Sequence, residues 1–136
     1  MTLVSEAMNR SVVAVAPDAT LAEATEVVRS TGAEHVLVMD EGTLVGILCA
    51  AELRGATEDD AVSARMSVPA LTVRPDALVE AAALTMFEEG VGCLPVAVGG
   101  LILGTVSGEE FARAGLAHPR PRCGREHRRR HRLEGR

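Results

Sequence analysis

Hydrophobic positions along the chain repeat with the periods of short strands and of amphipathic helices. The runs 11–15 (SVVAV) and 70–73 (ALTV) are rich in strand-forming residues and predict strands. Each run leads into a Pro-Asp turn and then into apolar residues at helical spacing, within 17–32 and 75–90. The pattern therefore predicts a strand followed by a helix, twice over.

The ends of the first predicted helix carry typical capping residues. Thr20 is a favourable N-cap residue, and Glu23 three positions later completes a capping box. Gly32 follows the last apolar position and predicts the end of the helix. We expect the second helix to start in the same way and to end at Gly90.

Each predicted helix is followed by two strand-forming runs around a tight turn. These runs cover 35–48 and 93–106, and the Gly-Gly pair at 99–100 is a two-residue hairpin signal. Short helical segments, 50–55 and 108–115, close the two halves. Each half therefore predicts the order strand, helix, strand, strand, helix.

The two halves are an internal repeat. When the chain is aligned with itself at an offset of 58 residues, 13 of 51 positions from Val4 to Arg54 are identical. Glycines that recur in register indicate that the same backbone turns occur twice. A unit of about 50 residues is marginal alone, so we predict an internally duplicated α/β (α+β) fold. Its two repeats are placed at 1–57 and 58–117.

The composition predicts an aliphatic core. Hydrophobic residues make up 47% of the chain, but Phe87 and Phe111 are its only aromatic residues. Without Trp or Tyr, binding of nucleic acid by stacking bases on aromatic side chains is disfavoured. The sequence also lacks a Walker motif and a G-x-S-x-G motif, and His35 is its only histidine before residue 118. We therefore expect no enzymatic activity and no required cofactor.

Charge divides the chain into an acidic body and a basic tail. Residues 1–117 carry six Arg against 17 Asp and Glu, a net −11, whereas residues 118–136 carry eight Arg against two Glu, a net +6. The tail has no apolar face, which predicts a disordered extension. Its arginines could contact nucleic acid, an anionic membrane surface or the acidic body, or they could stay solvated without a specific role. Cys123, His127 and His131 share a helical spacing, but without an evident fourth ligand we predict no metal site.

One uncharged stretch, 90–108, is nearly long enough to span a membrane. Its six glycines and Pro95 favour a strand, a turn and a strand instead. The N-terminus lacks the basic and apolar regions of a signal peptide, and three cysteines do not suggest a disulfide framework. We therefore expect a cytoplasmic protein without membrane contact.

The order, spacing and turn glycines of the duplicated unit resemble those of the CBS domain pair, or Bateman module. The resemblance covers residues 1 to about 115, through VSEAMNRSVVAVAPDATLAEA, GTLVGILCAAEL and GVGCLPV. It implies two three-stranded sheets flanked by helices, with pseudo-two-fold symmetry. It also implies a stand-alone regulatory module that senses an adenine nucleotide (AMP, ADP or ATP) or S-adenosylmethionine. Such a module is expected to form a homodimer and to pass its signal to an effector protein.

The same resemblance implies two elements for each ligand cleft. The first is a glycine followed five residues later by proline, which cups the adenine. The second is a Ser or Thr at a strand end, for phosphate, with an Asp three residues later for ribose. Both repeats have Glu in place of the Asp, and the first repeat lacks the proline and has Cys in place of the hydroxyl, so the second cleft is favoured. The residues implied are Gly90, Val91, Cys93, Leu94, Pro95, Ser107 and Glu110 in the second repeat, and Cys49 and Glu52 in the first.

Each of these residues also has a structural explanation. Ser107 and Glu110 would serve as a helix N-cap and an exposed acid, and Cys49 and Cys93 as small buried residues. A thiol at a helix N-terminus can also act as a redox sensor, which is another interpretation of Cys49. For the whole chain, the alternatives are a ligand-free protein interaction module and a nucleic-acid-associated protein acting through the tail.

Overall fold

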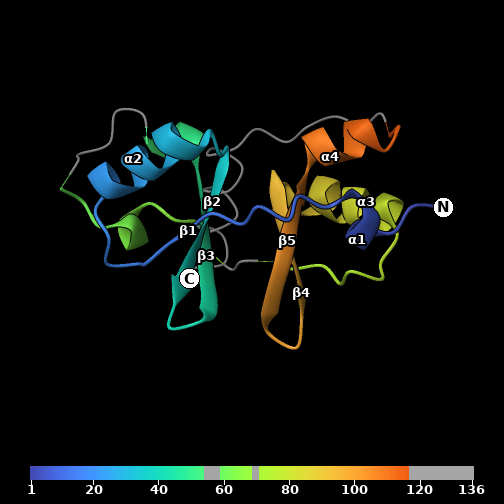
Figure 1. Ribbon diagram of the computed structural model, residues 1–136, viewed down its shortest axis with the longest axis horizontal. Coiled ribbons are helices and arrows are strands. Elements are labelled where there is room, and N and C mark those ends of the chain that lie inside the picture. The colour runs from blue at the N-terminus through green and yellow to red at the C-terminus, as the bar shows by residue number, and fades with distance from the viewer. Residues whose placement is uncertain (54–58, 69–70, 117–136) are drawn as a thin grey trace. The chain divides into compact units, whose positions relative to one another are not determined.

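The chain folds into two compact units, which we describe one at a time (Figure 1). The predicted tail 118–136 lies outside the residues that the computed structural model describes, which are 1–53, 59–68 and 71–116. We name each unit after the repeat whose hairpin it contains. The first-repeat unit holds the described residues from 13 to 68, and the second-repeat unit holds 1–12 and 71–116.

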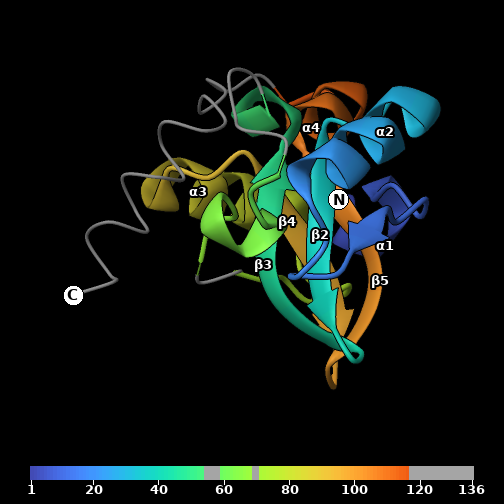
Figure 2. The same cartoon turned by 90° about the vertical axis from the view of Figure 1, so that its left-hand side faces the viewer.

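The first-repeat unit contains one helix longer than two turns and a three-stranded sheet in the order β1-β2-β3. β1 runs parallel to β2, and β2 and β3 form a twisted antiparallel hairpin (Figure 2). The elements are β1 (Ala14–Val15), α2 (Leu21–Thr31), β2 (His35–Asp40), β3 (Thr43–Cys49), and the short helices η1 (Ala50–Leu53) and η2 (Val62–Ala64).

The second-repeat unit repeats the order of helix, hairpin and short helix, so the predicted duplication of the fold is confirmed. Its hairpin, β4 and β5, is antiparallel with the same kind of register as β2 and β3. The elements are α1 (Val4–Ala7), α3 (Val79–Glu89), β4 (Cys93–Val98), β5 (Leu101–Ser107) and α4 (Gly108–Arg113).

The prediction of two three-stranded sheets is wrong for the second repeat, whose sheet has two strands. In the first repeat, the Leu37 N–H donates to the Val13 carbonyl (2.8 Å) beside β1. Pro95 occupies the equivalent position in the second repeat and has no N–H to donate. The parallel pairing shrinks to one bridge between Val73 and Val96, with two backbone hydrogen bonds of 2.9 Å.

Each unit is completed by a segment that precedes the other repeat in the chain. The leading segment, residues 2–9, places Val4 and Met8 in the core of the second-repeat unit. The linking segment, residues 60–67, places Val62 in the core of the first-repeat unit, with Met66 packed against it. The two segments are equivalent at the repeat offset of 58 residues. The second-repeat unit therefore joins two separate stretches of the sequence, 1–12 and 71–116.

The leading segment also changes how α3 begins. α2 begins as predicted, because the Thr20 hydroxyl accepts from the Glu23 N–H at 3.1 Å. The expectation of the same start for α3 is wrong, since Leu78 stands at the N-cap position and its side chain accepts nothing. The Val79 N–H donates instead to the Thr2 carbonyl of the leading segment (3.0 Å). A backbone group from elsewhere in the chain replaces the missing cap.

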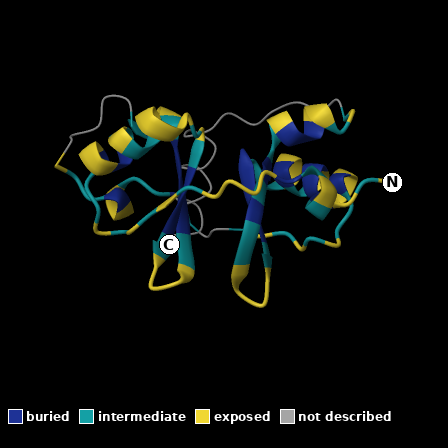
Figure 3. Ribbon diagram, in the orientation of Figure 1, coloured by how far each residue is buried: buried dark blue, intermediate teal, exposed yellow. Residues whose placement is uncertain are grey.

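The predicted turns are confirmed where a left-handed backbone is required. Gly32 and Gly90 end their helices with φ of 72° and 67°. The Gly-Gly pair at 99–100 turns the second hairpin with φ of 57° and 84°, and Glu41 and Gly42 do the same in the first with 49° and 83°. The tips of both hairpins are exposed (Figure 3).

Both cores are built on one face of a hairpin and the buried side of a helix, and both are aliphatic apart from Phe111. Alternate residues of each hairpin point into the core, as a strand pleat requires. The buried members are Val4, Met8, Val79, Ala82, Ala83, Met86, Val91, Leu94, Val96, Val106 and Phe111 in the second-repeat unit, and Leu21, Ala24, Val36, Val38, Leu48 and Val62 in the first.

Candidate ligand site

The two predicted ligand elements of the second repeat meet at one end of its hairpin. Cys93 pairs with Ser107 across β4 and β5, and Pro95 pairs with Thr105. The segment that begins at Gly90 therefore lies against the end of the strand that carries the hydroxyl. The equivalent pair in the first repeat is His35 with Cys49. In each repeat, the antiparallel register alone brings the two elements together.

The pleat separates these residues into two sets. Cys93, Pro95, Thr105 and Ser107 share one face of the hairpin, because directly opposed residues point the same way and alternate residues point apart. None of these four belongs to the apolar cluster that contains Leu94 and Phe111, although Cys93 is 1% exposed and Pro95 is also buried. We call this the outer face of the second-repeat hairpin.

Two predicted residues do not lie on the outer face. Val91 and Leu94 are buried members of the core of the second-repeat unit. Their side chains are therefore committed to packing, and only their backbone atoms remain available for a ligand. Gly90 ends α3 in the left-handed conformation and so sets the direction in which the chain enters β4.

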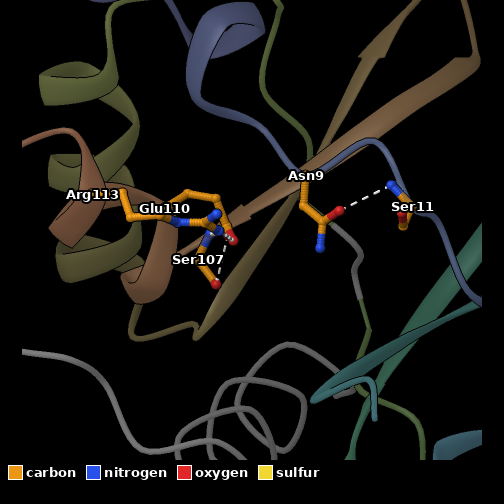
Figure 4. A network of polar contacts seen from close by, with 5 residues as sticks. All are labelled: Asn9, Ser11, Ser107, Glu110 and Arg113. Carbon is orange, nitrogen blue, oxygen red and sulfur yellow. Dashed lines mark hydrogen bonds and ion pairs between the residues drawn. The ribbon is translucent and has the colours of Figure 1, made fainter. Parts of the chain in front are cut away.

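Ser107, Glu110 and Arg113 form a compact polar network at the start of α4 (Figure 4). One carboxylate oxygen of Glu110 accepts from both the Ser107 N–H (2.7 Å) and the Ser107 hydroxyl (2.8 Å). The other oxygen accepts from the Arg113 guanidinium at 2.9 Å. Glu110 is not an exposed acid, since its side chain is 3% exposed, whereas that of Arg113 is 67% exposed.

This network determines which hydrogen-bond donors and acceptors are available to a ligand. The carboxylate of Glu110 is fixed in place by three donors, and a buried carboxylate needs such partners. The Ser107 hydroxyl donates to Glu110, which leaves its oxygen lone pairs as acceptors. The Ser107 N–H is occupied by the carboxylate, so the phosphate contact expected at this helix start would have to displace it. An incoming ribose hydroxyl could exchange with the Ser107 hydroxyl as a donor to Glu110.

A second ion pair of the second-repeat unit lies at its surface, in the turn before α3. Arg74 donates to Asp76 at 3.0 Å in the turn before α3, and both side chains are exposed. The hydrogen bond from Arg74 lowers the pKa of Asp76 below its ordinary value. Because the folded-state pKa is lowered, the pair contributes to stability at neutral pH, and this contribution is lost as the pH falls through that pKa. This ion pair stabilises the turn before α3 and is not part of the outer face.

The first repeat carries a different set of groups at the equivalent place. Cys49 ends β3 and Glu52 lies in η1, and each is 1% exposed. The position that matches Arg113 is residue 55, a glycine in the sequence. Burial of the Cys49 thiol disfavours a sensor role, because reactive cysteines are partly exposed in electropositive surroundings.

The sequence did not predict that the leading and linking segments each pair with a hairpin strand. Asn9 forms an antiparallel bridge with Thr105, and Ser67 forms the equivalent bridge with Ile47. The available signal was the recurrence of methionine just before each of these residues and of a glycine in each facing strand. Such a pattern does not say which repeat a segment will pack against.

The described part of the chain has neither a membrane-spanning helix nor a metal-binding cluster. Its longest helices have 11 residues, and none is long and apolar enough to cross a membrane. Its His, Cys, Asp and Glu side chains form no group of three or more that could hold a metal ion. Cys123, His127 and His131 lie outside this part.

The family model of the CBS domain matches the chain twice, at residues 4–59 and 61–117. The chain belongs to the CBS domain family. No curated protein sequence matched it. The two matched ranges correspond to the two repeats of the sequence.

Solved CBS structures share its fold. The CBS domain pair of MJ0100, in complex with 5′-methylthioadenosine and S-adenosyl-L-methionine, has a TM-score of 0.78 at 22% identity, covering 85% of this chain and 96% of that one. ATU1752 from Agrobacterium tumefaciens has a TM-score of 0.77 at 23% identity, covering 85% and 100%. CBSX2 in complex with AMP has a TM-score of 0.73 at 23% identity, covering 85% and 96%.

Proposed function

We propose that this CBS pair is a regulatory module that binds an adenine nucleotide or a related adenosyl ligand at its second repeat. The observation that carries the proposal is the register of β4 and β5, which joins the Gly90–Pro95 element to Ser107. Proteins of the same fold bind AMP, or 5′-methylthioadenosine and S-adenosyl-L-methionine. The ligand is therefore expected to lie on the outer face, away from the core.

In this proposal each residue has a distinct role. Pro95 and Cys93 provide the apolar surface for the adenine, with backbone contacts from the chain between Gly90 and Leu94. Ser107 and Glu110 receive the ribose or phosphate, with Glu110 held in place by Arg113. The first repeat, with Cys49 and Glu52, is the weaker site, because a thiol is a poor hydrogen-bond donor.

A second candidate, a ligand-free interaction module, is favoured by one observation. Both oxygens of Glu110 already have partners within the chain, as an N-capping acid would. In that case the serine and glutamate would stabilise α4 and have no ligand. Binding experiments separate the two candidates directly.

The proposal extends to assembly as a homodimer. Leu84 and Phe87 on α3 are 56% and 59% exposed. Neighbouring large apolar side chains in water are unfavourable and often mark a surface that another protein covers. At the equivalent positions of α2 the chain has the exposed ion pair of Glu26 and Arg29. We expect a cytoplasmic protein that signals to an effector protein. Contact with nucleic acid through the tail is a separate and weaker expectation.

Thermal unfolding in the presence of ligands tests the proposal. Unfolding should be followed with an external dye, because the chain has no Trp or Tyr. A ligand at 100 times its Kd adds about 2.7 kcal/mol, which raises the Tm by several degrees. AMP, ADP, ATP, 5′-methylthioadenosine and S-adenosylmethionine should be compared. A rise that Ser107→Ala reduces and Cys49→Ala leaves unchanged supports the second repeat, and no rise with any ligand favours the interaction module.

A further inference from the structure

The polar network at the start of α4 occupies the donors that a phosphate at this place would need. Ionised phosphate oxygens accept hydrogen bonds, so they bind to N–H and O–H groups. The two such groups of Ser107, its N–H and its hydroxyl, both donate to one oxygen of Glu110, at 2.7 and 2.8 Å. A phosphate would have to displace a carboxylate that is 3% exposed and carries the same sign of charge.

The length of the Glu110 side chain explains this arrangement. Glutamate has one methylene more than the aspartate that the CBS resemblance implies at this position. A serine followed three residues later by glutamate is the pattern of a capping box, in which the acid accepts from the backbone N–H of the serine. The departure from the family pattern therefore places a carboxylate on the donors that the family pattern assigns to phosphate.

The described residues of the second-repeat unit leave no basic side chain without an acceptor. They include three arginines and no lysine or histidine, against seven Asp and Glu. Each arginine donates to an oxygen of the chain itself: Arg10 to the Ser5 carbonyl (3.1 Å), Arg74 to Asp76 (3.0 Å) and Arg113 to Glu110 (2.9 Å). Arg113 holds the carboxylate oxygen that Ser107 does not, so it fixes Glu110 in place and leaves the Ser107 donors occupied.

The same network can accept a ribose. A ribose hydroxyl both donates and accepts, so it can donate to Glu110 and accept from the Ser107 hydroxyl. This exchange leaves the carboxylate in place and brings no second negative charge to it. A thioether at the 5′ carbon of the ligand adds no charge, and a sulfonium adds a positive charge that a carboxylate attracts.

We infer that Glu110 makes the second repeat selective for adenosyl ligands whose 5′ substituent is neutral or cationic, and selective against AMP, ADP and ATP. Glu110 is the specificity-determining residue, and Arg113 is a positioning residue that acts through it. The inference rests on the proposed function and narrows it from adenine nucleotides and adenosyl compounds in general to those without a phosphate.

Calorimetric titration of the full chain with adenosine, 5′-methylthioadenosine and AMP tests this inference. Adenosine and AMP differ only in the phosphate, so the ratio of their Kd values isolates its contribution. Glu110→Gln keeps an acceptor for Ser107 but removes the charge. Any loss of ribose contact in this variant affects both ligands and cancels in the ratio. Glu109→Gln is the matched control, because it removes the same charge from the adjacent, exposed position of α4.

In the unmodified protein, adenosine and 5′-methylthioadenosine should bind roughly 10- to 100-fold more tightly than AMP, as repulsion between close like charges requires. Glu110→Gln should reduce this ratio by at least about fivefold, because the repulsion is lost. Glu109→Gln should leave the ratio unchanged.

The comparison in the unmodified protein already decides the matter if Glu110→Gln does not fold. AMP binding as tight as adenosine overturns the inference and leaves the proposed function standing. A preference for adenosine that Glu110→Gln retains in full, or that Glu109→Gln reduces equally, also overturns it, because the acidic surface and not Glu110 would then exclude the phosphate. Absence of binding of all three ligands overturns the proposed function as well.

Discussion

Gly104 lies where the leading segment crosses β5, and alanine at this position should destabilise the second-repeat unit. A Cβ atom on Gly104 would stand 2.5 Å from the Asn9 carbonyl oxygen and 3.0 Å from the Met8 sulfur. The first of these is a backbone atom held by the bridge to Thr105, so it cannot move without breaking that bridge. The φ of Gly104 lies outside the left-handed region, so the cost is steric and not conformational.

The expected loss follows from three contributions. Overpacking costs about 1–3 kcal/mol. Loss of the two backbone hydrogen bonds between Asn9 and Thr105 costs about 0.5–1.5 kcal/mol each. Replacing a glycine inside a strand returns about 0.5–1 kcal/mol. The free energy of unfolding should therefore fall by about 1–5 kcal/mol, and a loss near the middle of this range lowers the Tm by roughly 10 °C.

Gly46→Ala is the matched control for this prediction. Gly46 occupies the equivalent position in β3, but the atom nearest to its added Cβ, at 2.6 Å, is the sulfur of the flexible Met66 side chain. The nearest backbone atom, the Ser67 carbonyl oxygen, lies at 3.1 Å. Urea unfolding followed by far-ultraviolet circular dichroism should show a smaller loss for Gly46→Ala. A Gly104→Ala protein as stable as the unmodified one would refute the packing described for the leading segment.

Three further changes test other parts of the structure. Pro95→Leu restores a backbone N–H at the sheet edge, so the third strand should extend and the amide of residue 95 should be protected from hydrogen exchange; rapid exchange would contradict this reason for the two-stranded sheet. Arg113→Ala removes one partner of the buried Glu110 and should cost about 1 kcal/mol after allowance for solvent screening, more than Arg29→Ala in its exposed ion pair. Deletion of residues 1–9 should remove exchange protection from the second-repeat unit and leave it in the first; unchanged protection of the second-repeat unit would show that the segment is not part of its core.

Much of the local structure could be predicted from the sequence. Capping residues and glycines are local signals, and they marked α2 from Thr20 to Gly32 and the turn of the second hairpin. The repeat offset then carried the same elements into the other half of the chain. The same offset gave one wrong prediction, a capped start for α3, where the Leu78 side chain provides no cap.

The remaining features depend on contacts that no local pattern encodes. The leading segment packs against β5, a long-range contact that the sequence does not distinguish from packing against β3. Both strands have a glycine at the equivalent position, Gly104 and Gly46. The burial of Glu110 contradicts the alternative in which it is an exposed acid, because its position on α4 does not show that Arg113 and Ser107 enclose its carboxylate. The edge of the second sheet was predictable in principle, since Pro95 lacks a donor.

The most direct test of the central claim is a map of backbone amide chemical shifts of the labelled protein as AMP is added. The claim predicts that the largest changes cluster on the outer face of the second-repeat hairpin, at Cys93, Thr105 and Ser107. Changes confined to α2 and α3, or no change at saturating AMP and 5′-methylthioadenosine, would contradict it.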